Sequence, residues 1–169
     1  MRVTVVDTNV VLVANGQHAD VSPECVKNCV LALQEIMRSG KLALDDGFLI
    51  LREYQNKTLP NQGKRPGDAF VKWALNNLCN AKRVDKVTLL EHDERGFESF
   101  PKDTDLVNFD APDRKFVAVS GAHLEKPSIA QATDSKWLNW DAALKRHGIE
   151  VSFLCKADIQ RFHESKFGE

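Results

Sequence analysis

Four acidic residues stand where carboxylates could act together rather than as solvated surface charges: Asp7, Glu53, Asp113 and Asp134. Clustered carboxylates cannot all stay ionised without a cation between them, because like charges raise one another's pKa. Mg²⁺ and Mn²⁺ are the usual cations, since hard ions take oxygen ligands. Such a site binds phosphate oxygens and lowers the pKa of a bound water, which is the chemistry of phosphodiester hydrolysis. The five histidines show no HxxxH or similar spacing that would favour zinc.

Two of these acids follow short apolar runs that are typical of buried strands. Asp7 comes directly after residues 2–6, and Asp134 comes just after residues 129–132. Ligands of open α/β sheets bind outside the carboxyl ends of the strands, so we expect both side chains at that edge. The alternative roles are a helix N-cap or turn residue for Asp7 and a loop acid before a helix for Asp134.

Asp113 lies in the first turn of an expected helix whose apolar side faces the sheet. Val117 and Ser120, four and seven residues later, share its face. This placement aims the Asp113 carboxylate at the edge of the sheet. The alternative is an acid that complements the helix dipole, and Asp110 competes with Asp113 for the third position.

Glu53 shares a helix face with Ile50, which puts it over the core side of its helix. The alternative is an exposed acid beside Arg52. If Glu53 is misplaced, the fallback acids are Asp45 and Asp46.

Strands and helices alternate along the chain. We expect strands at 2–6, 41–44, 128–132 and 149–154, an undecided strand or helix at 84–90, and helices from Ser22 to Gly40, at 47–56, 68–79, 112–123 and 138–147, and from 157 onward. This order predicts a three-layer α/β/α sandwich with a central, mainly parallel sheet of about four or five strands. The length of 169 residues predicts one domain, residues 1–169.

Composition narrows the function classes. With 23 basic and 24 acidic residues the net charge is −1, which excludes a generally basic wrapper of nucleic acid but leaves room for a local basic patch. The first apolar run is too short and too polar for a signal peptide or a membrane span, so we expect no membrane partner.

The cysteines form no CxxC pair. Cys25 and Cys29 are four residues apart in a helical pattern and are expected to be buried as hydrophobic side chains. Reduced thiols and a cytoplasmic location are the expectation.

The ordered motifs resemble a PIN domain, the metal-dependent nuclease fold that includes the VapC-type toxins. The matching segments span the whole chain: Val5-Val6-Asp7-Thr8-Asn9, Glu53, residues 113–120 and residues 133–137. The chain departs from the family pattern at Ala132, where the family commonly has Thr, and at Lys136, where a further acid is common.

The resemblance implies a fold, an activity and a ligand set. Asp7, Glu53, Asp113 and Asp134 would hold Mg²⁺ or Mn²⁺ and act as the catalytic acids. Asn9 would support Asp7, and Thr133 would support Asp134. The implied substrate is single-stranded nucleic acid, with RNA favoured, cut by a metal-activated water.

Contacts to the substrate are predicted from basic residues near these acids. Lys64 and Arg65 lie in the Gly- and Pro-punctuated loop 57–67, which has no acid and is otherwise an ordinary solvated loop. The other candidates adjoin proposed ligands or are ordinary helix-surface charges: Arg52, Arg114, Lys115 and Lys136. Trp137 is either a base-stacking side chain or a core tryptophan.

Several interpretations stay open beside the ribonuclease. A haloacid-dehalogenase-like phosphatase is disfavoured, because it needs an acid two residues after Asp7 and an amide at Asn9 cannot donate that proton. An inactive PIN-like binding module, a nuclease for single-stranded DNA, an antitoxin or other protein partner, and a homodimer are not decided by the sequence. Nor is the choice between a toxin, a defence nuclease and an RNA-processing enzyme.

Overall fold

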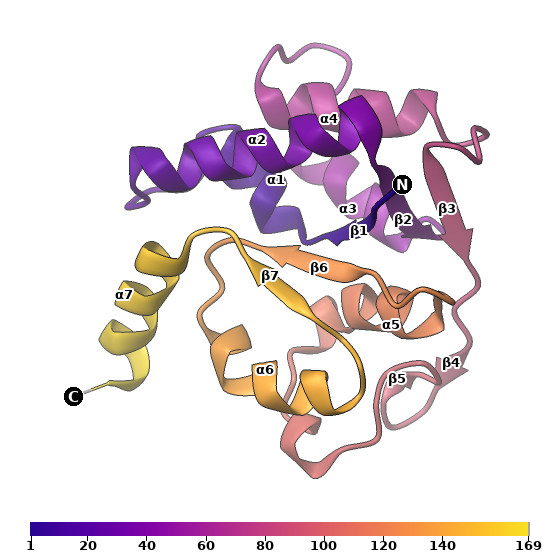
Figure 1. Ribbon diagram of the computed structural model, residues 1–169, viewed down its shortest axis with the longest axis vertical. Helices are drawn as coiled ribbons and strands as arrows, with labels where there is room; N and C mark the ends of the chain where they lie inside the picture. Colours follow the sequence, from indigo (N-terminus) through magenta and orange to yellow (C-terminus); the bar gives the residue numbers. More distant parts are fainter. Residues whose placement is uncertain (169) are drawn as a thin grey trace.

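Five parallel strands form the central sheet of residues 1–168, the part of the chain that the computed structural model describes (Figure 1). They are β1 (Val3–Val6), β2 (Lys41–Asp45), β3 (Val84–Val87), β6 (Ser128–Gln131) and β7 (Val151–Phe153), in the order β3-β2-β1-β6-β7. The undecided segment 84–90 therefore contributes an edge strand. The first strand is central, with Thr4 opposite Leu42 on one side and Ser128 on the other.

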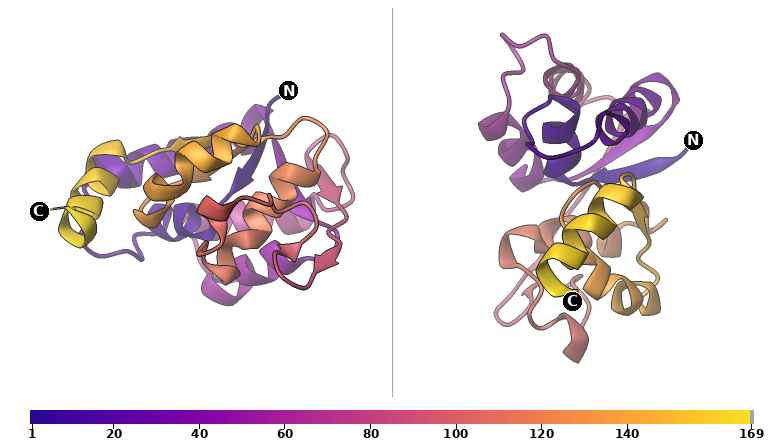
Figure 2. Two further views of the ribbon diagram at one scale, coloured as in Figure 1. Left: turned by 90° about the horizontal axis from the view of Figure 1, so that it is seen from below. Right: turned by 90° about the vertical axis from the view of Figure 1, so that its left-hand side faces the viewer.

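Helices cover both faces of this sheet, which confirms the predicted three-layer α/β/α sandwich (Figures 1 and 2). One face carries α1 (Thr8–Ala14), α2 (Pro23–Ser39), α3 (Leu49–Lys57) and α4 (Pro66–Asn76), and the other carries α5 (Arg114–Ala122) and α6 (Lys136–Arg146). The last helix, α7 (Lys156–Phe167), follows β7. The expected elements are present, with their ends shifted by at most three residues.

The start and end of α2 follow the sequence signals. Ser22 caps the helix through a bond from the Cys25 amide to its hydroxyl, at 3.1 Å, and Pro23 fills the first helical position. Gly40 closes the helix, and its amide donates to the Ile36 carbonyl.

Helix α1 is an element that the sequence analysis did not anticipate. Residues 10–13 of this helix, Val-Val-Leu-Val, are all apolar and three of them are β-branched, which favours a strand by local propensity. The helix is nevertheless buried among the sheet, α2 and α4, with Val10, Val11 and Val13 fully inaccessible. Tertiary packing of its whole circumference therefore outweighs the weak helix propensity of its residues.

The acidic segment 91–113 forms a small subdomain beside α5. It contains a hairpin of β4 (Glu91–His92) and β5 (Gly96–Phe97), followed by the 3₁₀ turns η1 (Thr104–Leu106) and η2 (Ala111–Asp113). Arg114 holds it in place. Its guanidinium donates to the carbonyls of Arg95 and Val107, each at 3.0 Å, and lies 4.5 Å above the Phe100 ring.

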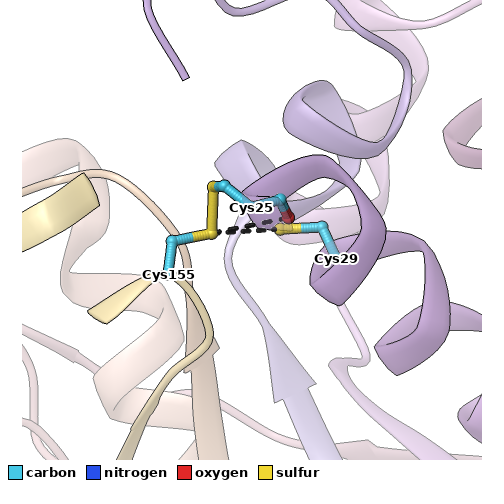
Figure 3. Close-up of side chains that lie close together, drawn as sticks. All are labelled: Cys25, Cys29 and Cys155. Atoms are coloured by element: carbon cyan, nitrogen blue, oxygen red, sulfur yellow. Dashed lines mark hydrogen bonds between the residues drawn. A yellow bond between two sulfur atoms is a disulfide. The ribbon is translucent and has the colours of Figure 1, made fainter. Parts of the chain in front are cut away.

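A disulfide between Cys25 and Cys155 joins the start of α2 to the residue before α7, across 130 residues of sequence (Figure 3). The expectation of reduced thiols was therefore wrong for these two residues, because residues far apart in the sequence meet here. Cys29 is buried as expected, and its sulfur lies 3.8 Å from that of Cys155. Burial, aided by the charge of Asp158, raises the pKa of the Cys29 thiol to about 12, which leaves it unreactive.

The core lies on both faces of the sheet. Val5 and Val6 are fully buried, as are Tyr54 and Phe70 on the α1–α4 side and Phe116 on the other. Among the helices of residues 1–168, none combines the length and the apolar character needed to cross a bilayer.

Candidate metal centre

Asp7 occupies the carboxyl end of the central strand, as predicted, and it also caps α1. Its side chain is almost fully buried. One carboxylate oxygen accepts from the Asn9 amide at 2.9 Å, and the other accepts from the Gln131 side-chain amide at 3.0 Å. The N-cap role, proposed as the alternative, is therefore real, and it coexists with a place at the ligand-binding edge of the sheet.

Gln131 is the residue that organises this edge, and the sequence analysis missed it. It ends β6, is fully buried, and donates to Asp7. Its side-chain oxygen accepts from the Asn9 side chain and from the Ala132 amide at 3.1 Å. Asn9 in turn accepts from the Ala132 amide at 3.2 Å. Asn9 therefore contacts Asp7 directly through its backbone amide and indirectly through its side chain and Gln131.

Three further acids converge beside Asp7. A carboxylate oxygen from each of Asp110, Asp113 and Asp134 lies within 4.8 Å of the other two. We call these residues the acidic trio. They come from three places in the chain: before η2, at the N-cap of α5, and just before α6. The sequence offers Asp110 and Asp113 as alternatives for the third acid, and the fold brings both into the same cluster.

The pKa values show how closely these carboxylates interact. Burial and then the charge of Asp113 raise the pKa of Asp7 to about 7. Burial and then the charge of Asp134 raise the pKa of Asp113 to about 6. Burial also raises the pKa of Asp134, with Asp110 contributing. Each raised pKa means that ionising the carboxylate costs free energy in this buried, negatively charged surrounding. A cation bound among the oxygens would lower that cost.

Glu53 lies on α3, which contacts α5, the helix that Asp113 caps. One of its oxygens is 3.1 Å from the Lys115 ammonium, and the other accepts from the Thr8 hydroxyl. Its charge is also one of the causes that raise the pKa of Asp113. We call Asp7, Glu53 and the acidic trio together the acidic site.

The fallback acids have other partners. Asp45 caps α3 by accepting from the amides of Leu49, at 2.7 Å, and Ile50, at 3.0 Å. Asp46 accepts from the Thr88 hydroxyl at 2.6 Å. These contacts favour Glu53 over both of them as the ligand from this part of the chain.

The basic residues predicted to touch nucleic acid fall into two groups. Lys115 and Lys136 each pair with one acid of the acidic site, Lys115 with Glu53 and Lys136 with Asp110, both at 3.1 Å. Arg52 on α3 and Lys64 in the loop before α4 are exposed.

Two other predicted contacts are already engaged elsewhere. Arg65 pairs with the buried Asp68 at 2.9 Å, and Arg114 holds the 91–113 segment as described above. These structural roles argue against assigning either guanidinium to the substrate.

The two remaining candidates are buried. Trp137 is fully buried, with its ring edge-on to Phe109 at a centroid distance of 5.0 Å, so the core alternative is confirmed. Thr133 is buried directly before Asp134, which suits a supporting role rather than direct contact with a substrate.

The donor set of the acidic site fits a hard divalent cation. Carboxylate oxygens from different elements converge, and burial makes their unpaired charges unfavourable. Asp7, Asp113 and Asp134 would be the ligands on the side of the sheet, with Asp110 and Glu53 released from their lysine partners to complete the set.

Comparisons of the chain with protein-family models, curated proteins and solved structures found no match. The function proposed below therefore rests on the geometry of the acidic site and on the motifs of the sequence.

Proposed function

We propose that this chain is a PIN-like, divalent-metal-dependent endoribonuclease that hydrolyses single-stranded RNA at the acidic site. The observation that carries the proposal is the meeting of Asp113 and Asp134, predicted from separate motifs, with carboxylate oxygens within 4.8 Å of each other. Their charges also add to the raised pKa of the buried Asp7 at the end of the central strand. Asp110 and Glu53 add two further carboxylates. Toxin, defence and RNA-processing roles all remain compatible with this chemistry.

Each side chain has a distinct task in the proposed reaction. Asp7, held by Gln131 and the Asn9 amide, presents a fixed oxygen at the sheet edge. Asp113 and Asp134 present theirs from the starts of two helices. A bound Mg²⁺ or Mn²⁺ would polarise the scissile phosphate and lower the pKa of a bound water.

Lys115 and Lys136 are the cations next to these oxygens. Each is paired with a carboxylate, Lys115 with Glu53 and Lys136 with Asp110. If a bound metal took those carboxylates as ligands, Lys115 and Lys136 would be free to contact the phosphate oxygens of the substrate. The same lysines thus neutralise the acidic site without metal and the nucleic-acid backbone with it.

The test is cleavage of end-labelled single-stranded RNA and DNA with Mn²⁺, Mg²⁺ or EDTA. We expect metal-dependent cutting of RNA that Asp113→Asn reduces by at least about a thousandfold, because one ligand oxygen is lost from the reacting centre. The matched control is Asp93→Asn, an acid-to-amide change in the exposed hairpin turn, which should cut like the wild type.

Three results would change the proposal. Preferred cutting of DNA would reassign the substrate. Strand binding without cutting under any metal would favour the inactive PIN-like module. Cutting that survives in a folded Asp113→Asn protein would exclude the acidic site.

We include a cytoplasmic location in this proposal. The Cys25–Cys155 disulfide argues against that location, because disulfides are rare in the cytoplasm. An antitoxin or other protein partner and a homodimer are compatible with the proposal but have no support in the described residues.

A further inference from the structure

A groove of about 480 Å³ opens beside Glu53, between α3 and the segment that leads from β5 to α5. We call it the α3 groove. Its charged lining is Arg52, Glu53, Lys57 and Lys115, and its apolar lining includes Phe97 and Pro112. The acidic site does not account for Arg52, Lys57 or Phe97.

The α3 groove adjoins the acidic site, because Glu53 belongs to both. Glu53 and Lys115 line the groove, and their side chains form the 3.1 Å ion pair next to Asp113. A chain lying in the groove would therefore contact Glu53, the carboxylate of the acidic site that lines the groove.

The charge of the groove away from Glu53 is positive. Arg52 and Lys57 are exposed, lie on α3, and have no carboxylate partner among the ion pairs of residues 1–168. The chain as a whole has a net charge of −1, so this pair of free cations is a local feature that suits a polyanion.

Phe97 gives the groove an aromatic surface. It lies in β5, which contacts α5, and its side chain is half-buried against the core. A half-buried ring in a groove with exposed cations is the arrangement with which proteins bind unpaired bases, since a base stacks on the ring while the cations hold the backbone. An acidic peptide would satisfy the cations but would leave the ring without a planar partner.

We propose that the α3 groove binds the single-stranded nucleic acid that enters the acidic site, with Arg52 and Lys57 on its phosphates and one base stacked on Phe97. This inference rests on the proposed function for its ligand class. It assigns a specificity-determining role to Phe97 of β5, which supplies the ring.

Binding is measured by fluorescence anisotropy of a labelled single-stranded RNA in EDTA, where no cutting occurs. We expect Arg52→Gln with Lys57→Gln to weaken binding about tenfold at low salt. The slope of log Kd against log salt should fall by about 1.4, since two phosphate contacts are lost. The matched control, Lys72→Gln with Lys82→Gln, removes two exposed lysines outside the groove and should leave the slope unchanged.

The stacking role is tested with an abasic strand of the same length. We expect Phe97→Leu to weaken binding of the normal strand about tenfold, to leave the abasic strand unaffected, and to be rescued by Phe97→Tyr. Equal losses for both strands, no loss for either, or no rescue would overturn the stacking assignment. Polyglutamate competing as well as RNA would do the same, because it would show recognition of charge alone.

This result is independent of catalysis. If the wild-type protein cuts nothing but the groove substitutions still weaken RNA binding as expected, the nuclease proposal fails and the groove assignment holds. If the Arg52→Gln/Lys57→Gln and Phe97→Leu proteins bind RNA with unchanged affinity and cut it normally, the groove assignment fails and the nuclease proposal stands.

Discussion

At the scale of single residues, the positions of some side chains in the acidic site could be predicted from the sequence and those of others could not. The position of Asp7 was predictable because an acid directly after an apolar strand falls at the carboxyl edge of a parallel sheet. Gln131 was not, because an uncharged amide at a strand end carries no signal until the neighbouring strand is known. Only the pairing of β1 with β6 brings its side chain to Asp7.

The raised pKa of Asp7 predicts a pH-dependent gain in stability for Asp7→Asn in the absence of metal. The folded-state pKa of about 7 lies above the ordinary value of 3.8, so the folded protein binds the proton more tightly than the unfolded chain. Stability conferred by that proton is present at low pH and is lost as the pH rises from about 4 to 7. The variant lacks this titration. The free energy of unfolding of Asp7→Asn minus that of the wild type should therefore be at least about 2 kcal/mol larger at pH 8 than at pH 5, so the variant gains stability over the wild type as the pH rises.

Urea unfolding in EDTA at the two pH values measures this difference, with Asp93→Asn as the exposed control. Saturating Mn²⁺ should reverse the order of stability at pH 8, because the cation stabilises the wild-type carboxylate. A difference between Asp7→Asn and wild type that does not change with pH would contradict the burial of a charged Asp7.

At the scale of elements, the predictable parts were those with local signals. The Ser22-Pro23 start and Gly40 end of α2 are read from three residues, and β1, β2 and β6 from β-branched and apolar runs. Helix α1 was not predictable, because its Val-rich sequence favours a strand and only its burial among neighbouring helices makes it helical. The hairpin of β4 and β5 lies in a charged segment without an alternating apolar pattern.

The Cys25–Cys155 disulfide is an element-scale feature with its own prediction. It joins α2 to α7, and Asp158 of α7 reinforces the junction by accepting from the Ser22 amide at 2.6 Å. Because it closes a loop of 130 residues, Cys25→Ala with Cys155→Ala should cost about 2–5 kcal/mol of unfolding free energy. In a chain of this size the melting temperature should fall by roughly 5–15 °C.

Thermal unfolding with and without reductant checks this expectation, with the exposed Cys79→Ala as the control. Alkylation of the unreduced, unfolded chain should label Cys29 and Cys79 but neither Cys25 nor Cys155. Labelling of all cysteines, or a melting temperature that reductant does not change, would show that the bond is not formed.

At the scale of the whole molecule, the fold explains why acids so distant in sequence meet. Parallel strands place all their carboxyl ends at one edge, so Asp7 after β1 and Asp134 after β6 become neighbours. Of the four predicted acids, Asp113 and Asp134 meet in the acidic trio, and their charges add to the raised pKa of Asp7. Glu53 is linked to α5 by its ion pair with Lys115. The sequence could not predict that Asp110 and Asp113 both join the cluster, or that Lys115 and Lys136 pair with acids. Both features depend on how η2 and α6 approach each other.

The central claim is that the acidic site holds a divalent cation, and a Mn²⁺ titration followed by electron paramagnetic resonance tests it most directly. Free Mn²⁺ gives a sharp spectrum that is lost on binding, so affinity is read without any substrate. We expect saturable binding by the wild type and by Asp93→Asn, and at least about tenfold weaker binding by Asp113→Asn and Asp134→Asn, since each loses a charged oxygen ligand. Equal Mn²⁺ binding by all four proteins, or none by the folded wild type, would contradict the assignment of the acidic site as a metal centre.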